Sequence, residues 1–199
     1  MKPRHLALSA VLLSGPALAD GGNAEGPVSE LRLGIAAHDI RIPGIGPDGR
    51  PEKSLALQGE VVFRKPRLLR PLLSPRPYLA GSLNLGGHTS HAGGGLLWRQ
   101  GFGDRFYGDF AFGAVVHTGA LEFPAPTTPE AYYRFKADTA QNIEFGSRVL
   151  FREQFTLGMR VDRAWAGGLF CEHLSHGRIL SSRANQGLDT VGLRLTRRF

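Results

Sequence analysis

The sequence predicts an all-β fold, an eight-stranded antiparallel transmembrane β-barrel of the outer membrane. Three observations predict it. After an N-terminal export signal, apolar and polar side chains alternate with a period of two in eight segments, an even number. Several polar faces carry charges that suit pairing inside a small lumen. The chain also ends on a strand whose last residue is Phe199, which resembles the C-terminal aromatic signature of outer-membrane proteins.

Residues 1–19 have the features of a secretory signal peptide. A short basic region with Lys2 and Arg4 precedes an apolar run at 6–13, and Ala17-Leu18-Ala19 gives a small-x-small cleavage pattern. The apolar run is well short of the roughly 20 residues that a membrane-spanning helix needs. We therefore expect residues 20–199 to form the barrel as one domain. The single cysteine, Cys171, excludes an intrachain disulfide.

The amino-acid composition limits the classes of partner expected for this chain. The formal net charge is +7, and 27 glycines favour strands and tight turns over helices. A basic surface suits a polyanion, either nucleic acid, anionic lipid or phosphorylated lipopolysaccharide. Because an exported protein is separated from the nucleic acid of the cell, we expect lipid or lipopolysaccharide as the partner.

The first five predicted strands cover residues 29–40, 53–65, 76–87, 91–101 and 104–117. In the first two, aliphatic residues occupy one parity, while Gln58 and Glu60 occupy the other parity of the second. In the third, leucines alternate with tyrosine, serine and asparagine. The fourth is rich in glycine and ends near Trp98. In the fifth, phenylalanines face one way and Asp109 and His117 the other.

The last three predicted strands cover 142–152, 155–175 and 188–199. Each again has one apolar parity, and the lumen charges expected from this pattern are Glu60, Asp109, Glu144 and Arg148. A soluble sandwich would bury the apolar parity as its core. In the barrel that parity faces lipid, and the lipid-facing band includes Leu57, Phe110, Phe145, Leu193 and Phe199.

Connection lengths set the expected topology, because periplasmic turns are short in such barrels and outer loops are long. The joins near 101–104 and 152–155 are expected to be periplasmic, as are both termini. The Pro-rich stretch 118–141 and the connection 176–187 are expected to be outer loops. The basic, Pro-rich segment 65–77 is an unusually long periplasmic turn.

One cluster of polar side chains lies on the predicted lipid face, where polar groups are costly and need a reason. His173 and Ser175 are two apart on a strand and share that face. A hairpin centred near residue 181 puts Asp189 opposite His173, with Cβ atoms about 5 Å apart. In this set His173 takes the proton of Ser175, Asp189 holds the imidazole, and Ser175 attacks an ester carbonyl.

Here the sequence resembles the lipid A 3-O-deacylases of the PagL type, in the acyloxyacyl hydrolase family. The motifs His-x-Ser-Asn and Asn-x-Gly-x-Glu of that family are similar to residues 173–176 and 185–189, and segments 86–90 and 112–119 also resemble it. The resemblance implies an outward-facing triad of Ser175, His173 and Asp189. It implies hydrolysis of the ester-linked acyl chain at the 3-position of lipid A, without a metal or other cofactor.

The chain departs from the family pattern at two positions. The glutamate of the triad is Asp189 here, one methylene shorter but chemically competent. The asparagine that helps to form the oxyanion hole is His176, whose neutral imidazole N–H can donate the same hydrogen bond. The backbone N–H of Gly177 is another candidate donor, and Asn185 is expected to support the site.

Other readings stay open. A non-enzymatic barrel, structural or lipopolysaccharide-binding, would follow if the oxyanion hole is degenerate. A narrow porin is disfavoured because side chains fill an eight-stranded lumen. A metal cluster of His88, His91 and His117 is disfavoured because two of these lie at a loop and one faces the lumen. The expected partners are lipid A or lipopolysaccharide and outer-membrane lipids, with lipid A phosphates near Arg41, Arg50 and Arg178; a homodimer stays open.

Overall fold

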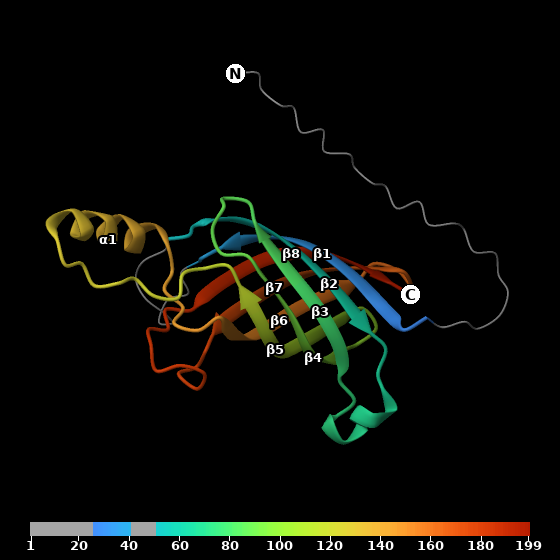
Figure 1. The fold of residues 1–199 in the computed structure, drawn as a ribbon. Helices are drawn as coiled ribbons and strands as arrows, with labels where there is room; N and C mark the ends of the chain where they lie inside the picture. The colour runs from blue at the N-terminus through green and yellow to red at the C-terminus, as the bar shows by residue number, and fades with distance from the viewer. Residues whose placement is uncertain (1–25, 41–50) are drawn as a thin grey trace.

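The computed structural model describes residues 26–40 and 51–199. Eight antiparallel strands follow one another around a closed barrel, and β1 pairs with β8 to complete it (Figure 1). The strands are β1 (Val28–His38), β2 (Ser54–Phe63), β3 (Arg76–Asn84), β4 (His91–Phe102), β5 (Phe106–His117), β6 (Val149–Arg160), β7 (Trp165–Ser175) and β8 (Leu188–Arg198). The predicted signal peptide and Arg41 and Arg50 lie outside the described residues.

The barrel wall has two chemically opposite faces. Outward side chains are aliphatic or aromatic and remain exposed, for example Leu33 at 72% and Leu193 at 64%. A continuous apolar surface of this kind does not suit water, but it suits the hydrocarbon of a bilayer. Leu57, Phe110 and Phe199 are exposed on this surface, which confirms their predicted outward position.

The inner face is a network of buried charges. Glu60 contacts Arg32 at 3.2 Å, Arg194 at 2.9 Å and also Arg152. Asp109 pairs with Arg32 at 2.8 Å and with Arg99 at 2.6 Å. Buried charges are tolerated only when paired, so this network fills the lumen with compensated ions. The lumen positions predicted for Glu60 and Asp109 are confirmed.

The boundaries predicted for the sixth and seventh strands, 142–152 and 155–175, are wrong, and so is the turn predicted near 152–155, which lies inside β6. β6 starts at Val149, and a turn at 161–164 separates it from β7. In that turn the Asp162 carboxylate accepts hydrogen bonds from the backbone N–H groups of Ala164 at 2.6 Å and Trp165 at 2.7 Å. The turn contains neither glycine nor proline, and Val161 and Trp165 keep the same apolar parity on either side of Arg163, so the sequence pattern hid the break.

Residues 142–148 therefore form part of the long connection between β5 and β6. Phe145 is fully buried rather than facing lipid, in a cluster that packs inside that end of the barrel with Val115, Ile143, Leu150, Leu174 and Leu188. The Arg148 guanidinium donates to the backbone carbonyl of His117 at 2.6 Å, and the backbone N–H of Glu144 donates to the Gln186 side chain. The lumen positions predicted for Glu144 and Arg148 are thus wrong.

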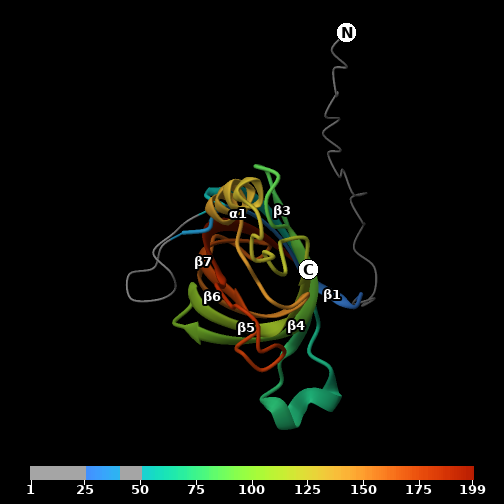
Figure 2. The same cartoon turned by 60° about the vertical axis from the view of Figure 1, so that its left-hand side comes forward.

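The two ends of the barrel differ. One end carries residues 39–40 and 51–53 and the connections 85–90, 118–148 and 176–187, and α1 (Pro129–Gln141) projects beyond it (Figure 1). Thr128 caps α1 by accepting from the N–H of Ala131 at 3.2 Å, and Pro129 occupies the first turn. The opposite end holds the short turns, the C-terminus and the β2–β3 connection with the 3-10 helix η1 (Arg67–Leu72) (Figures 1 and 2). Within the described residues, no helix is long and apolar enough to cross a membrane.

Candidate active site

The register of β7 and β8 brings a histidine and a carboxylate together on the outer wall. His173 lies directly opposite Asp189, and its Nδ1 is 2.7 Å from Asp189 Oδ1. The histidine side chain is 36% exposed and the aspartate side chain 10% exposed. A bond of this length between Nδ1–H and a carboxylate fixes the ring and its tautomer. The other nitrogen, Nε2, is left as the acceptor.

Ser175 lies two residues further along β7, on the same face as His173. The β7–β8 ladder ends one step earlier, with Leu174 opposite Leu188, and Gly187 directly precedes β8. The imidazole edge lies against Gly187, since a Cβ there would be 3.1 Å from His173 Cε1 and 3.8 Å from Nε2. In this part of the structure no hydrogen bond joins the His173 and Ser175 side chains, as is common before a substrate binds.

The turn after Ser175 is held by side chains of the β7–β8 loop. The Asn185 Oδ1 accepts from the N–H of His176 at 3.2 Å. The His176 ring is fully buried, its Nε2 donates to the Ala184 carbonyl at 3.0 Å, and its Nδ1 accepts from the N–H of Arg178 at 3.2 Å. Both ring nitrogens are thus engaged within the loop. This differs from the expectation that the His176 imidazole N–H points at the reacting group.

The long outer loop 118–148 supports this turn. Glu144 donates its N–H to the Gln186 side chain at 2.7 Å and accepts from the Gln186 N–H at 3.3 Å. Arg183 also pairs with Glu122 at 2.8 Å. Sequence reasoning missed these contacts because it placed Glu144 in a strand.

Glu52 joins three outer loops at the same end. Its buried carboxylate accepts from the backbone N–H groups of Thr89 and Ile143 and from the Thr89 hydroxyl, each at 3.0 Å, and lies 3.4 Å from His38 Nε2. Burial alone raises the pKa of Glu52, but the hydrogen bonds to His38, Ile143 and Thr89 outweigh it and hold this pKa below its usual range.

A second carboxylate flanks the histidine on its other side. The β6–β7 register places Glu153 directly opposite His173, and Glu153 is exposed on the outer wall. His173 thus lies between Glu153 on β6 and Asp189 on β8. Sequence reasoning missed Glu153 because its predicted strand ended at residue 152; alternation over the true β6 would have found it.

An apolar hollow of about 290 Å³ lies on the same outer wall. It is displaced from His173 and Asp189 by one outward-facing position, toward the end of the barrel opposite α1. Its outward lining includes Phe155, Leu157, Leu169, Cys171 and Val191. Cys171 is two residues from His173 and Val191 is two residues from Asp189, so the hollow lies beside the site. Its lining and position suit a hydrocarbon chain.

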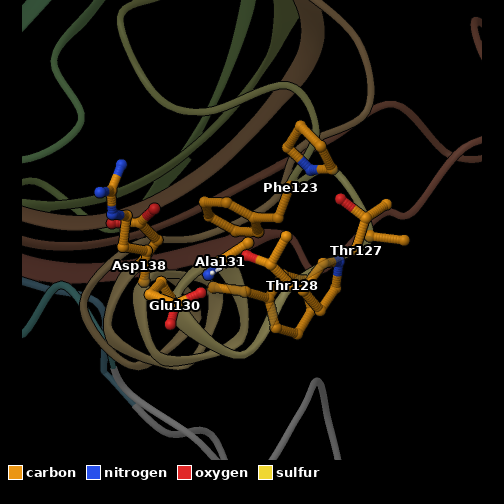
Figure 3. Close-up of a pocket in the computed structure, with 11 residues that line it drawn as sticks. Phe123, Thr127, Thr128, Glu130, Ala131 and Asp138 are labelled. Carbon is orange, nitrogen blue, oxygen red and sulfur yellow. Dashed lines mark hydrogen bonds between the residues drawn. The ribbon is translucent and has the colours of Figure 1, made fainter.

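A second hollow, of about 380 Å³, lies between α1 and residues 123–128 (Figure 3). Phe123, Thr128, Glu130 and Asp138 line it, and no member of the triad does. The histidines away from the triad also have structural contacts: His91 Nε2 lies 3.3 Å from Glu172, and His117 Nε2 donates to the Ser147 carbonyl at 2.7 Å. Among residues 26–40 and 51–199, no group of three or more His, Cys, Asp or Glu side chains is arranged to hold a metal ion.

The crystal structure of the outer membrane enzyme PagL superposes with a TM-score of 0.52 at 10% identity, covering 84% of this chain and 98% of that one. The backbone structure of the *Yersinia pestis* outer membrane protein Ail in a nanodisc gives a TM-score of 0.42 at 8% identity, covering 84% and 99%. No curated protein matches. The family model described as lipid A 3-O-deacylase (PagL) matches residues 80–198, which include the whole hairpin of the triad. The chain therefore belongs to the lipid A 3-O-deacylase (PagL) family of outer-membrane β-barrels.

Proposed function

We propose that this chain is a carboxylic ester hydrolase that removes the acyl chain at the 3-position of lipid A. Ser175 is the nucleophile, His173 the base and Asp189 the acid. The observation that carries the proposal is the 2.7 Å bond between His173 and Asp189 on the lipid-facing wall, within the region that the family model matches. A polar pair on a lipid-facing surface costs free energy, so its presence there points to a function.

In the proposed reaction His173 Nε2 accepts the Ser175 proton as Oγ attacks the ester carbonyl. Asp189 stabilises the imidazolium that forms. The same proton then passes to the sugar oxygen as the ester bond breaks, leaving the acyl group on Ser175. A water molecule, deprotonated by His173, releases the fatty acid and restores Ser175.

The developing oxyanion needs a preorganised donor. We propose the backbone N–H of Gly177, a residue that is exposed beside Ser175 with φ 59°. His176 and Asn185 then act as positioning residues. Their hydrogen bonds to Ala184 and to the His176 N–H fix the turn that presents Gly177.

The hollow beside the triad is the proposed binding site of the acyl chain. The difference between the two ends of the barrel supports a proposed orientation in the membrane. Long connections face outward in such barrels, which puts the end with α1 outside and both chain ends in the periplasm. The triad lies where β7 enters and β8 leaves an outer loop, so it would meet lipid A in the outer leaflet. Arg178, exposed in that loop, is placed to meet lipid A phosphate.

The test is mass spectrometry of fatty acid released from purified lipid A by the refolded barrel. Ser175→Ala should abolish release while heat-modifiable gel mobility stays unchanged, since a half-buried hydroxyl on the barrel surface contributes little to stability. Ser182→Ala, an exposed serine in the adjoining loop, is the matched control and should keep full activity. If the folded parent releases nothing but His176→Asn does, the chain is a lipopolysaccharide-binding barrel with a degenerate site.

A further inference from the structure

The β2–β3 connection, residues 64–75, carries a charge pattern that the proposed reaction does not use. It holds Arg64, Lys65, Arg67 and Arg70, and the sequence contains no acidic residue between Glu60 and Asp104. Lys65, Arg67 and Arg70 are exposed. The connection lies at the end of the barrel away from the triad (Figure 1).

The same connection exposes an unusual amount of apolar surface. Leu68 is 86% exposed, Leu72 52% and Leu73 85%, and η1 buries none of its residues. Leu73 and Ser74 adopt left-handed backbone conformations with φ 66° and 53°, which side chains with a Cβ rarely adopt. Exposed leucines in a strained segment need a compensating environment.

A hydrogen bond fixes where this segment lies. The Trp98 indole N–H donates to the Leu72 carbonyl at 2.8 Å, and the Trp98 ring stacks on Phe110 of the outer wall at a centroid distance of 5.9 Å. This hydrogen bond ties the end of the segment at Leu72 to the lipid-facing wall.

The rest of this end reinforces the positive charge. Within the described residues, the turns 103–105 and 161–164 and the adjoining strand ends add only two acids, Asp104 and Asp162, against five bases: Arg105, Arg160, Arg163, Arg197 and Arg198. Basic clusters beside a bilayer attract anionic lipids. Arginine in particular binds phosphate through paired N–H groups.

We propose that the β2–β3 connection is a binding site for anionic phospholipid. Leu68, Leu72 and Leu73 enter the acyl region of the leaflet at this end, and Arg67 and Arg70 contact headgroup phosphates. The segment anchors the barrel at a fixed depth, on the leaflet opposite the triad. A protein partner is disfavoured because the Trp98 contact ties one end of the segment to the lipid-facing wall.

The test uses Trp98 as a native reporter in the full barrel, with Trp165→Phe removing the other indole. The protein is refolded into phosphatidylcholine vesicles that contain the same minor fraction of either brominated phosphatidylglycerol or brominated phosphatidylcholine. We expect brominated phosphatidylglycerol to quench Trp98 about twofold more strongly, because a basic cluster enriches anionic lipid around it. Equal quenching by the two lipids would overturn the proposal.

Variants separate charge from folding. Arg67→Gln with Arg70→Gln should remove the excess quenching, whereas Arg134→Gln with Lys136→Gln on α1 should leave it. Leu68→Ser with Leu73→Ser should weaken quenching by both lipids. Survival of the excess in the Arg67/Arg70 double variant would refute headgroup binding. Both leaflets of the vesicle have the same lipids, so the result depends neither on orientation nor on ester hydrolysis, and failure here leaves the proposed function standing.

Discussion

Asp189→Asn is the sharpest test of the triad. The side chain keeps its shape and loses its charge, so the 2.7 Å bond to His173 Nδ1 no longer stabilises an imidazolium or holds the tautomer. Loss of the charge of a triad acid typically lowers kcat by about 10⁴, or about 5 kcal/mol of transition-state stabilisation. The assay is the initial rate of fatty acid release from lipid A by folded barrel. Gel mobility confirms that each sample is folded.

Glu153→Gln is the matched control, because Glu153 flanks the same histidine from β6. No hydrogen bond joins Glu153 to His173 in the described structure, so its neutralisation should lower kcat by less than about tenfold, as expected for an exposed charge acting through solvent. Double substitution should cost little more than Asp189→Asn alone. If Glu153→Gln abolishes activity and Asp189→Asn does not, the acid has been assigned to the wrong strand.

Three further predictions concern the support of the site. Glu60→Gln should destabilise the barrel by about 3–5 kcal/mol, measured by urea unfolding in lipid vesicles, because it leaves three buried guanidiniums without their shared carboxylate. Since the folded-state pKa of Glu52 is lowered, its stabilisation is complete above its unfolded pKa of about 4.3 and is lost as the pH falls through the folded value. The thermal unfolding temperature of Glu52→Gln should accordingly fall less than that of the parent on acidification below about pH 4; equal slopes would contradict this. His176→Ala should lower kcat by less than the 10²–10³ typical of a direct oxyanion donor, and a larger loss in a folded variant would return the imidazole to that role.

The sequence predicted best those strands in which apolar and polar residues alternate with a period of two and a clear turn segment follows. The hairpin of β7 and β8 was predicted with His173 opposite Asp189, and the register shows that pairing. The inward positions of Glu60, Asp109 and Glu172 also follow from parity alone, because successive side chains of a strand point to opposite faces.

The errors share one physical cause. Local alternation cannot show where a strand ends when the turn lacks glycine and proline, as at Asp162-Arg163-Ala164. Apolar residues that cap the lumen, such as Ile143 and Phe145, then look like lipid-facing ones. The helix Pro129–Gln141 was missed for a related reason: none of its residues is buried, so it has no apolar face to read.

The inner charges and the outer triad depend on each other through register. Arg152 of β6 bonds Glu172 of β7 at 2.6 Å inside the barrel, next to the residues Glu153 and His173 that face each other outside. Because the side-chain period is two, a slip of one residue would send this ion pair into lipid and the imidazole into the lumen. Either charge on the lipid side is costly, so the lumen network strongly opposes that slip. The same buried ions that lie in the lumen thereby hold His173 where it meets Asp189 and, on the proposed mechanism, Ser175.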